Sequence, residues 1–278
     1  MKIFDQSKRI FDQSKRIFDL HCHIFPEKIA DRAVEGIGDF YKMPMFNIGT
    51  AADLTARHKE NGICGAMVCS VATAPEQVAA INDFIAAAVA DSQGFFVGFC
   101  SLHPDMSEIE LDSEIERAKS LGLCGIKLHP DFQKFHADGK RACKVYEAIG
   151  NRLPILIHAG DSRFPYSSPH RIAGALDSFP ALTMIAAHFG GWSEWEDAIL
   201  ALAGKPNLYV DTSSSLYEIS SAKAVEYIAA FGEDRVLFGT DYPMWDIRLE
   251  LERFDKLDLS ESAREKILYR NVQELLGL

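Results

Sequence analysis

The stretch IFDLHCH, residues 17–23, joins a short apolar segment to two histidines that stand two residues apart. Side chains alternate between the two faces of a β-strand, so His21 and His23 share one face while Cys22 points to the other. Two imidazoles on one face can bind the same metal ion. An HxH pair alone is weak evidence, because it is often structural or accidental. The remainder of the chain must show whether further ligands converge on it.

The same stretch is also the third start of a repeated unit. The heptad IFDQSKR occupies residues 3–9 and 10–16, and the third copy breaks off into the two histidines. The first two copies have arginine where the third has His23, and an arginine would repel a cation. Two heptads are too short for a coiled coil. We therefore predict that residues 1–16 are an extension outside the fold and that residues 17–278 form one domain.

Composition narrows the class of protein. The chain has 278 residues, of which 47% are hydrophobic and 25% charged, enough to bury a full core. With 29 Lys+Arg against 40 Asp+Glu, the net charge of −11 argues against nucleic acid or an anionic membrane as partner. No apolar run is long enough to span a membrane, and no signal peptide is recognised. The six cysteines form no CxxC pair, which favours buried, reduced thiols in a cytoplasmic protein.

Short apolar runs, rich in β-branched and aromatic residues, alternate with helical patterns along the chain. They lie at residues 17–21, 63–70, 95–102, 124–129, 154–158, 183–188, 207–212 and 235–241. Such runs are typical of parallel strands that are buried on both faces. Eight strands, each followed by helical sequence, predict a (β/α)8 TIM barrel. A doubly wound sheet is the alternative, but it would usually show a glycine-rich turn after the first strand, where this chain reads HCHIFPE.

One connection, residues 24–49, is unusually long. It contains the apolar but aperiodic segment DFYKMPMFNIG. Connections of this length in compact domains are usually lids or binding loops. We expect either a lid over the mouth of the barrel or a helical excursion that only plugs its side.

Residues suited to metal binding or catalysis stand at the ends of the predicted strands. Besides the first pair, they are Lys127 and His129 in IKLHP, His158 in LIHAG, His188 in AAHFGG, Asp211 in VDTSS and Asp241 in FGTDYP. The carboxyl ends of the strands form the active-site face of a (β/α)8 barrel. Alone, His158 would be an ordinary core histidine and Asp241 a helix cap. The joint placement of these two with His21 and His23 predicts a divalent metal site.

The ordered motifs FDLHCH, GIKLHPDFQKF, PILIHAG, IAAHFGG, NLYVDTS, VLFGTDYP and ILYRNVQELLGL resemble the amidohydrolase superfamily. They are most similar to its amidohydrolase-2 branch, which includes the aminocarboxymuconate-semialdehyde decarboxylase-like enzymes. The resemblance implies that one divalent transition metal, most often zinc, is bound by His21, His23, His158 and Asp241. It further implies that His188 lies beside the metal-bound water or the substrate. Asp241, where it is partly free of the metal, can serve as the catalytic base. These motifs do not specify a substrate.

Other residues at this end are candidates for binding the substrate. Lys127 and His129 share a strand face; Lys127 is expected to hold a substrate anion or support the structure, with a bridging role between two metals as the alternative. Arg163 either pairs with a substrate carboxylate or is a solvated loop residue. Trp192 either lines the pocket or anchors a helix. Asp211 is expected to fix loops by hydrogen bonds.

Together these features favour a cytoplasmic metal-dependent hydrolase that cleaves an amide, lactone or other ester of a small molecule, which can carry a carboxylate. A non-oxidative decarboxylase of the same branch is the alternative, although the chain is short for one. A TatD-like phosphoesterase would need an acidic ligand after the fourth strand, and a non-enzymatic binding barrel would need no open coordination position. The expected partner is a small substrate, with a homo-oligomer left open.

Overall fold

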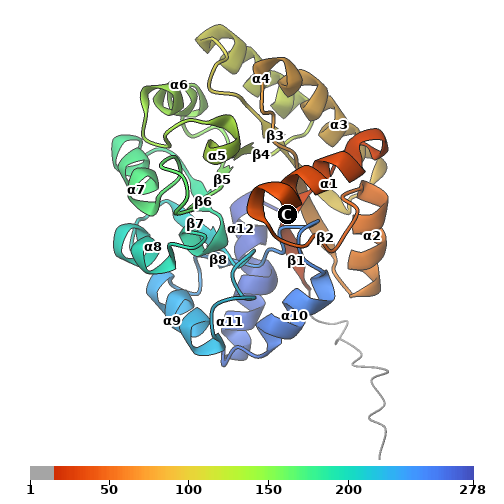
Figure 1. The fold of residues 1–278 in the computed structure, drawn as a ribbon, viewed down its shortest axis with the longest axis vertical. Coiled ribbons are helices and arrows are strands. Elements are labelled where there is room, and N and C mark those ends of the chain that lie inside the picture. The colour runs from red at the N-terminus through yellow and green to blue at the C-terminus, as the bar shows by residue number, and fades with distance from the viewer. Residues whose placement is uncertain (1–15) are drawn as a thin grey trace, which may run out of the picture.

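A computed structural model describes residues 16–278, so the predicted extension, apart from Arg16, lies outside the described residues. Eight parallel strands follow one another in chain order around the sheet, as Figure 1 shows. They are β1 (Phe18–His23), β2 (Gly65–Cys69), β3 (Phe96–Ser101), β4 (Gly125–Leu128), β5 (Ile155–Ile157), β6 (Met184–Ala186), β7 (Leu208–Asp211) and β8 (Val236–Leu237). The predicted (β/α)8 barrel is confirmed. β1 runs two residues further than predicted, so both of its histidines belong to the strand itself.

Helices cover the outside of the barrel. They are α1 (Glu27–Tyr41), α2 (Ala51–Glu60), α3 (Val78–Asp91), α4 (Glu108–Ser120), α5 (Pro130–Gln133), α6 (Lys140–Ile149), α7 (Pro169–Ser178), α8 (Trp195–Leu202), α9 (Ser221–Phe231), α10 (Ile247–Asp255), α11 (Glu261–Glu265) and α12 (Asn271–Leu276), with shorter turns η1 (Pro75–Gln77), η2 (His188–Gly190) and η3 (Lys266–Arg270). Ser107 caps α4, since its side chain accepts a hydrogen bond from the backbone N–H of Glu110.

The barrel closes between its first and last strands. Separate backbone hydrogen bonds join β1 to the segment after β8. Among them, Asp241 N donates to His21 O at 2.8 Å and His23 N donates to Tyr242 O at 2.6 Å. We call this junction the β1–β8 seam. Because it joins the first strand to the last, it brings together residues more than 200 positions apart in the chain.

The interior of the barrel is a packed core. Phe18 and Leu20 of β1, Phe99 of β3 and Leu156 of β5 are buried there together, and Val272 of α12 belongs to the same cluster. Side chains of alternate strands fill the interior of barrels of this kind. A substrate must therefore bind at one end of the barrel and not inside it.

The long connection contains a helix, α1, which Figure 1 shows in red. Several α1 side chains, among them Ile29, Ile37 and Tyr41, line the cavity at the carboxyl ends of the strands. The helix therefore forms a wall of the barrel mouth and is more than a plug on its side.

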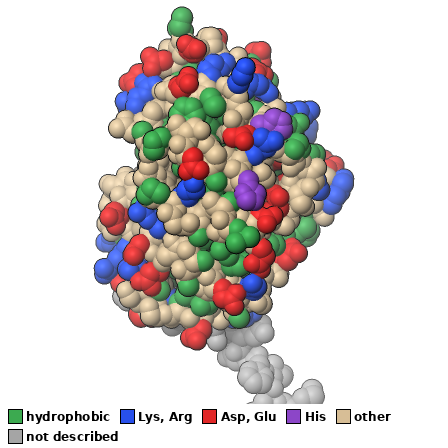
Figure 2. Space-filling model, turned by 90° about the vertical axis from the view of Figure 1, so that its left-hand side faces the viewer, with side chains coloured by type: hydrophobic (Ala, Val, Ile, Leu, Met, Phe, Trp, Pro, Cys, Tyr) green, Lys and Arg blue, Asp and Glu red, His purple; other side chains and the backbone are tan. Residues whose placement is uncertain are grey.

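The surface and the helices bear on possible partners. On the face seen in Figure 2, acidic and basic side chains are interspersed, with no broad area of one sign. Within residues 16–278, every helix is too short or too polar to cross a membrane.

All six cysteines are free, but burial is less general than predicted: Cys22, Cys69 and Cys100 are buried, whereas Cys64 is exposed.

Candidate active site

A cavity of about 730 Å³ opens at the carboxyl ends of the strands. Seven polar residues predicted from the sequence are among those that line it: His21, His23, Lys127, His129, His158, His188 and Asp241. The walls are largely apolar and come from α1, from α3 and from the segments that follow β1, β4 and β8. The structure thus gathers the strand-end residues into one pocket.

Three of the predicted metal ligands form a tight cluster across the β1–β8 seam. Nε2 of His21 lies 3.2 Å from Nε2 of His23, and each nitrogen lies 3.5 Å from Oδ1 of Asp241. A tetrahedral ion with bonds of about 2.0–2.2 Å separates its ligand atoms by roughly 3.3–3.6 Å. Two imidazoles and a carboxylate with this spacing fit one divalent transition metal, with room for further ligands.

The orientation of His21 is set by Asp211. Oδ2 of Asp211 lies 2.9 Å from Nδ1 of His21, so Nδ1 carries the proton and Nε2 presents its lone pair to the cluster. Burial alone would raise the pKa of Asp211, but the neighbouring His21 lowers it below its usual value. Oδ1 of Asp211 also accepts the backbone N–H groups of His188 and Ser213. Asp211 therefore fixes the site by hydrogen bonds, as the sequence predicted.

A hydrogen bond fixes the orientation of the Asp241 carboxylate in the cluster. Oδ2 accepts a hydrogen bond from Ser214 Oγ at 2.6 Å, which leaves Oδ1 facing the two histidines. Burial opposes ionisation, but His21 and His188 outweigh it and lower the pKa of Asp241 to about 2. Asp241 is therefore a carboxylate at neutral pH, ready to bind a cation or accept a proton.

Lys127 is almost fully buried beside the cluster. Its Nζ lies 2.9 Å from Nε2 of His21, and burial lowers the pKa of its ammonium group. Nζ therefore places a hydrogen-bond donor in the pocket beside the three-residue cluster. A substrate anion bound there would meet this amine.

His158, the fourth predicted ligand, lies in the pocket but outside the three-residue cluster. Its Nδ1 lies 3.1 Å from Nε2 of His188, and its buried Nε2 lies 3.5 Å from Asp131 without a hydrogen-bond partner. Burial lowers the pKa of His158 well below 6.5 and that of His188 to about 4. Both imidazoles are neutral at neutral pH and can offer a lone pair to a metal ion or a proton.

The structure places Arg163 and Trp192 behind the pocket wall. Arg163 donates to both carboxylate oxygens of Asp161, at 2.8 and 2.7 Å, and to the carbonyl oxygen of Phe40 at 2.8 Å. Its guanidinium group also lies 5.5 Å from the ring centre of Trp192. Neither residue lines the cavity. Arg163 instead fixes the carboxyl-terminal end of α1.

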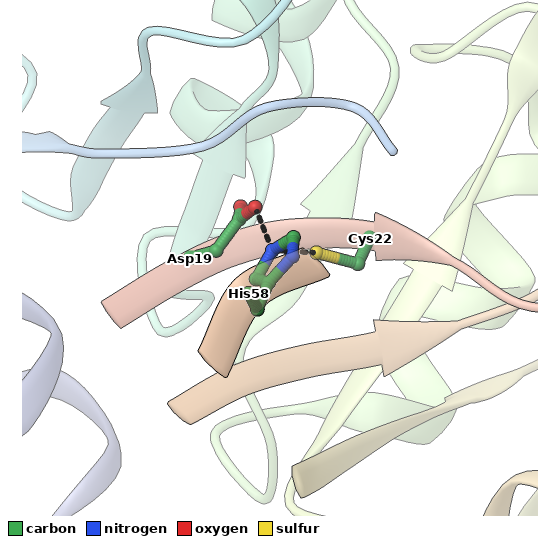
Figure 3. Close-up of side chains that lie close together, drawn as sticks. All are labelled: Asp19, Cys22 and His58. Atoms are coloured by element: carbon green, nitrogen blue, oxygen red, sulfur yellow. Dashed lines mark hydrogen bonds and ion pairs between the residues drawn. The ribbon is translucent and has the colours of Figure 1, made fainter. Parts of the chain in front are cut away.

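A buried link behind the site was not predicted. Figure 3 shows Asp19 and Cys22 of β1 beside His58 of α2. Oδ1 of Asp19 accepts the backbone N–H groups of His21 at 3.1 Å and Thr240 at 3.0 Å. Oδ2 accepts the Thr240 hydroxyl at 2.6 Å and lies 2.8 Å from Nε2 of His58. One carboxylate therefore ties together the two backbone segments that carry the three-residue cluster, on opposite sides of the β1–β8 seam.

The same three side chains are spaced closely enough to suggest a second metal site. However, Nε2 of His58 donates its proton to Asp19, so it has no lone pair for an ion. Cys22 Sγ makes only a long contact of 3.8 Å with His58, and burial raises the pKa of its thiol well above 9. The geometry is that of a structural link. The sequence signal for it was present, since Asp19 stands two residues before His21.

We expect Asp19→Asn to weaken metal binding about 10- to 100-fold, the usual effect of losing a group that supports a metal ligand. In this variant the side-chain amide nitrogen would point at an N–H or O–H group that donates to the carboxylate in the wild type. Two donors cannot pair, so the contact would displace His21 or Thr240. Competition with a chelator would measure the affinity. Cys22→Ala is the matched control from the same buried group and should leave the affinity unchanged. Equal losses in both variants would assign Asp19 a general role in stability only.

Comparisons with known proteins identify a matching family model and a similar relative. The Amidohydrolase family model (Amidohydro_2) matches residues 18–278. A gamma-resorcylate decarboxylase of Polaromonas sp. strain JS666 is 27% identical, over 71% of this chain and 75% of the relative.

Two solved structures share the fold. An uncharacterized TIM-barrel protein from Bordetella bronchiseptica has a TM-score of 0.79 at 22% identity, covering 94% of this chain and 98% of its own. A dihydroxybenzoic acid decarboxylase from Polaromonas sp. JS666, with bound manganese and 2-nitroresorcinol, has a TM-score of 0.72 at 20% identity, covering 95% and 97%. The family model spans nearly the whole described chain, from β1 to the last helix. The chain therefore belongs to the amidohydrolase family, in its amidohydrolase-2 branch.

Proposed function

We propose that the protein is a metal-dependent, non-oxidative decarboxylase of a small aromatic acid that carries a hydroxyl group beside its carboxylate. The observation that carries the proposal is the lining of the pocket. It combines Lys127 and the three-residue cluster with apolar side chains that include Phe84 and Phe132. The apolar side chains suit an aromatic ring, and Lys127 and the cluster suit its acidic group.

The relatives reverse the ranking that the sequence favoured. Hydrolysis was preferred because the chain is short, but length does not enter the chemistry of the site. The gamma-resorcylate decarboxylase and the dihydroxybenzoic acid decarboxylase are both named for removing a carboxylate from a ring. Hydrolysis of an amide, lactone or other ester remains the second candidate, because the cluster also suits water activation.

The residues of the pocket can carry the proton that decarboxylation requires. When bound, a divalent metal at the cluster would offset the negative charge of the acid. Asp241, ionised at neutral pH, accepts the proton of the substrate hydroxyl and returns it to the ring carbon that bears the carboxylate. The bond from that carbon to the carboxylate then breaks, its electron pair returns to the ring, and CO2 leaves. The phenolate oxygen regains a proton from solvent. His188, neutral and beside His21, holds the substrate oxygens in position.

We further propose that His158 joins His21, His23 and Asp241 as a ligand of one divalent metal. Nitrogen and carboxylate donors suit both zinc and manganese. Zinc was expected from the sequence, whereas the Polaromonas structure contains manganese. Both ions therefore need testing. We also propose a cytoplasmic enzyme acting on a small molecule, without a nucleic-acid or membrane partner.

The reaction can be tested with protein loaded with zinc or manganese. We expect 2,6-dihydroxybenzoate to be consumed with one CO2 released per molecule and with an exchangeable proton placed on the ring. Run in H2(18)O, the aromatic product should contain no heavy oxygen. A lactone or amide panel in the same buffer provides the comparison. Heavy oxygen in the product of one of those substrates, with no CO2 from any acid, would establish the hydrolase instead.

A further inference from the structure

Tyr41, the last residue of α1, was not among the residues predicted from the sequence, yet it lines the cavity. Its ring packs edge-on against Trp192, with 5.2 Å between ring centres, and lies 6.1 Å from the ring of His158. Its hydroxyl oxygen lies 2.9 Å from Nε2 of His129. The direction of this hydrogen bond decides what the hydroxyl group can do for a ligand.

The backbone settles the tautomer of His129. Its Nδ1 accepts a hydrogen bond from the backbone N–H of Phe132 at 3.3 Å, at the start of α5. A backbone N–H can only donate, so Nδ1 must present a lone pair. Because Nδ1 is unprotonated, the ring carries its single proton on Nε2.

It follows that Nε2 of His129 donates to Tyr41 and that the tyrosine oxygen accepts. The hydroxyl hydrogen of Tyr41 is then left over. Burial raises the pKa of Tyr41 well above 10, so the hydrogen stays on the oxygen at neutral pH. Within residues 16–278, His129 is the only protein group at hydrogen-bond distance from this hydroxyl. Tyr41 lines the cavity, so a ligand bound in the pocket can accept this hydrogen.

We propose that the Tyr41 hydroxyl group donates a hydrogen bond to a carboxylate oxygen of the bound aromatic acid and so selects for carboxylate-bearing ligands. This inference rests on the proposed function. A carboxylate is the acceptor because it gives the strongest hydrogen bond to a neutral donor and because the amine of Lys127, a further donor, lines the same pocket. Tyr41 thus recognises the group that the reaction removes.

The position of Tyr41 depends on the end of α1. The guanidinium group of Arg163 lies 5.6 Å from the centre of the Tyr41 ring, and it donates to the backbone oxygen of the preceding residue, Phe40. Asp161 holds the guanidinium group on its other side. Arg163 is therefore a positioning residue: it acts on the acid through Tyr41 and does not bind it directly.

Tyr41→Phe is the direct test, because it keeps the ring and removes only the hydroxyl group. Calorimetry with zinc- or manganese-loaded protein would measure the Kd of 2,6-dihydroxybenzoate. We expect the Kd to rise roughly 10-fold or more, as is usual for the loss of a hydrogen bond to a charged group, while metal content stays unchanged. Tyr217→Phe is the matched control: its hydroxyl accepts from Trp192 at 3.1 Å and does not line the cavity. It should leave the Kd unchanged.

The possible outcomes separate this inference from the proposed function. Equal Kd values for Tyr41→Phe and wild type, or no binding of the acid by wild type, would overturn the inference. A wild-type protein that binds the acid with a Tyr41-dependent Kd but releases no CO2 would overturn the proposed function and leave the inference standing. Nitrogen-15 NMR gives an independent check, since a protonated Nδ1 on His129 would remove the free donor and with it the argument.

Discussion

The double substitution His21→Ala with His23→Ala is expected to reduce bound divalent metal from about one equivalent to nearly none. The two Nε2 atoms lie 3.2 Å apart and supply two of the three atoms in the cluster. Removing both leaves the Asp241 carboxylate and the proposed ligand His158, which lies outside the cluster, and this pair should bind a transition metal only weakly. Elemental analysis of protein purified without chelator would measure the metal content, and turnover should be lost with the metal.

The control for this experiment is His136→Ala, which removes an exposed imidazole outside the cavity. It should leave metal content and turnover as in wild type. A circular dichroism spectrum would confirm that the double variant keeps its fold. If the folded double variant still held one equivalent of metal, the cluster would be the wrong site.

The second large effect is expected from Asp241→Asn. The amide keeps the size of the side chain but neither accepts a proton nor neutralises a cation. General acid–base groups typically contribute about 10²–10⁴-fold in rate, so turnover should fall by at least that factor. Rates of CO2 release under metal saturation would measure the effect apart from any loss of affinity.

His188→Asn provides the informative comparison with Asp241→Asn. His188 lies outside the cluster of three ligand atoms, so this variant should lose turnover but keep most of its metal. Asp177→Asn, at an exposed carboxylate paired with Lys205, should change neither quantity. Complete loss of metal in His188→Asn would place His188 among the ligands and change its role in the proposal.

The parts of the fold that the sequence predicted are those with a local signal. Each buried strand is a continuous apolar run, and the ligand candidates follow these runs directly, as His158 follows PILI and Asp241 follows VLFGT. Because parallel strands end at the same face, their order in the chain was enough to bring these residues into one pocket. No knowledge of long-range packing was required for this step.

The remaining features depend on contacts between distant segments. Arg163 was a candidate for binding the substrate. However, one nitrogen of its guanidinium group donates to the carbonyl oxygen of Phe40, which lies 123 residues earlier in the chain. Tyr41 stands in a connection without clear periodicity, so nothing in its surroundings pointed to the pocket. The distance between His158 and the cluster is likewise set by side-chain packing, which a motif does not specify.

The β1–β8 seam also determines when the site can form during synthesis. His21 leaves the ribosome early, whereas Thr240 and Asp241 are made more than 200 residues later. Contacts between such distant segments form late, because the intervening chain must first be ordered. A nascent chain that stops before β8 has both histidines but lacks their carboxylate partner. The metal would therefore bind only after the barrel has closed, and the bound ion would then link the two sides of the β1–β8 seam in the folded enzyme.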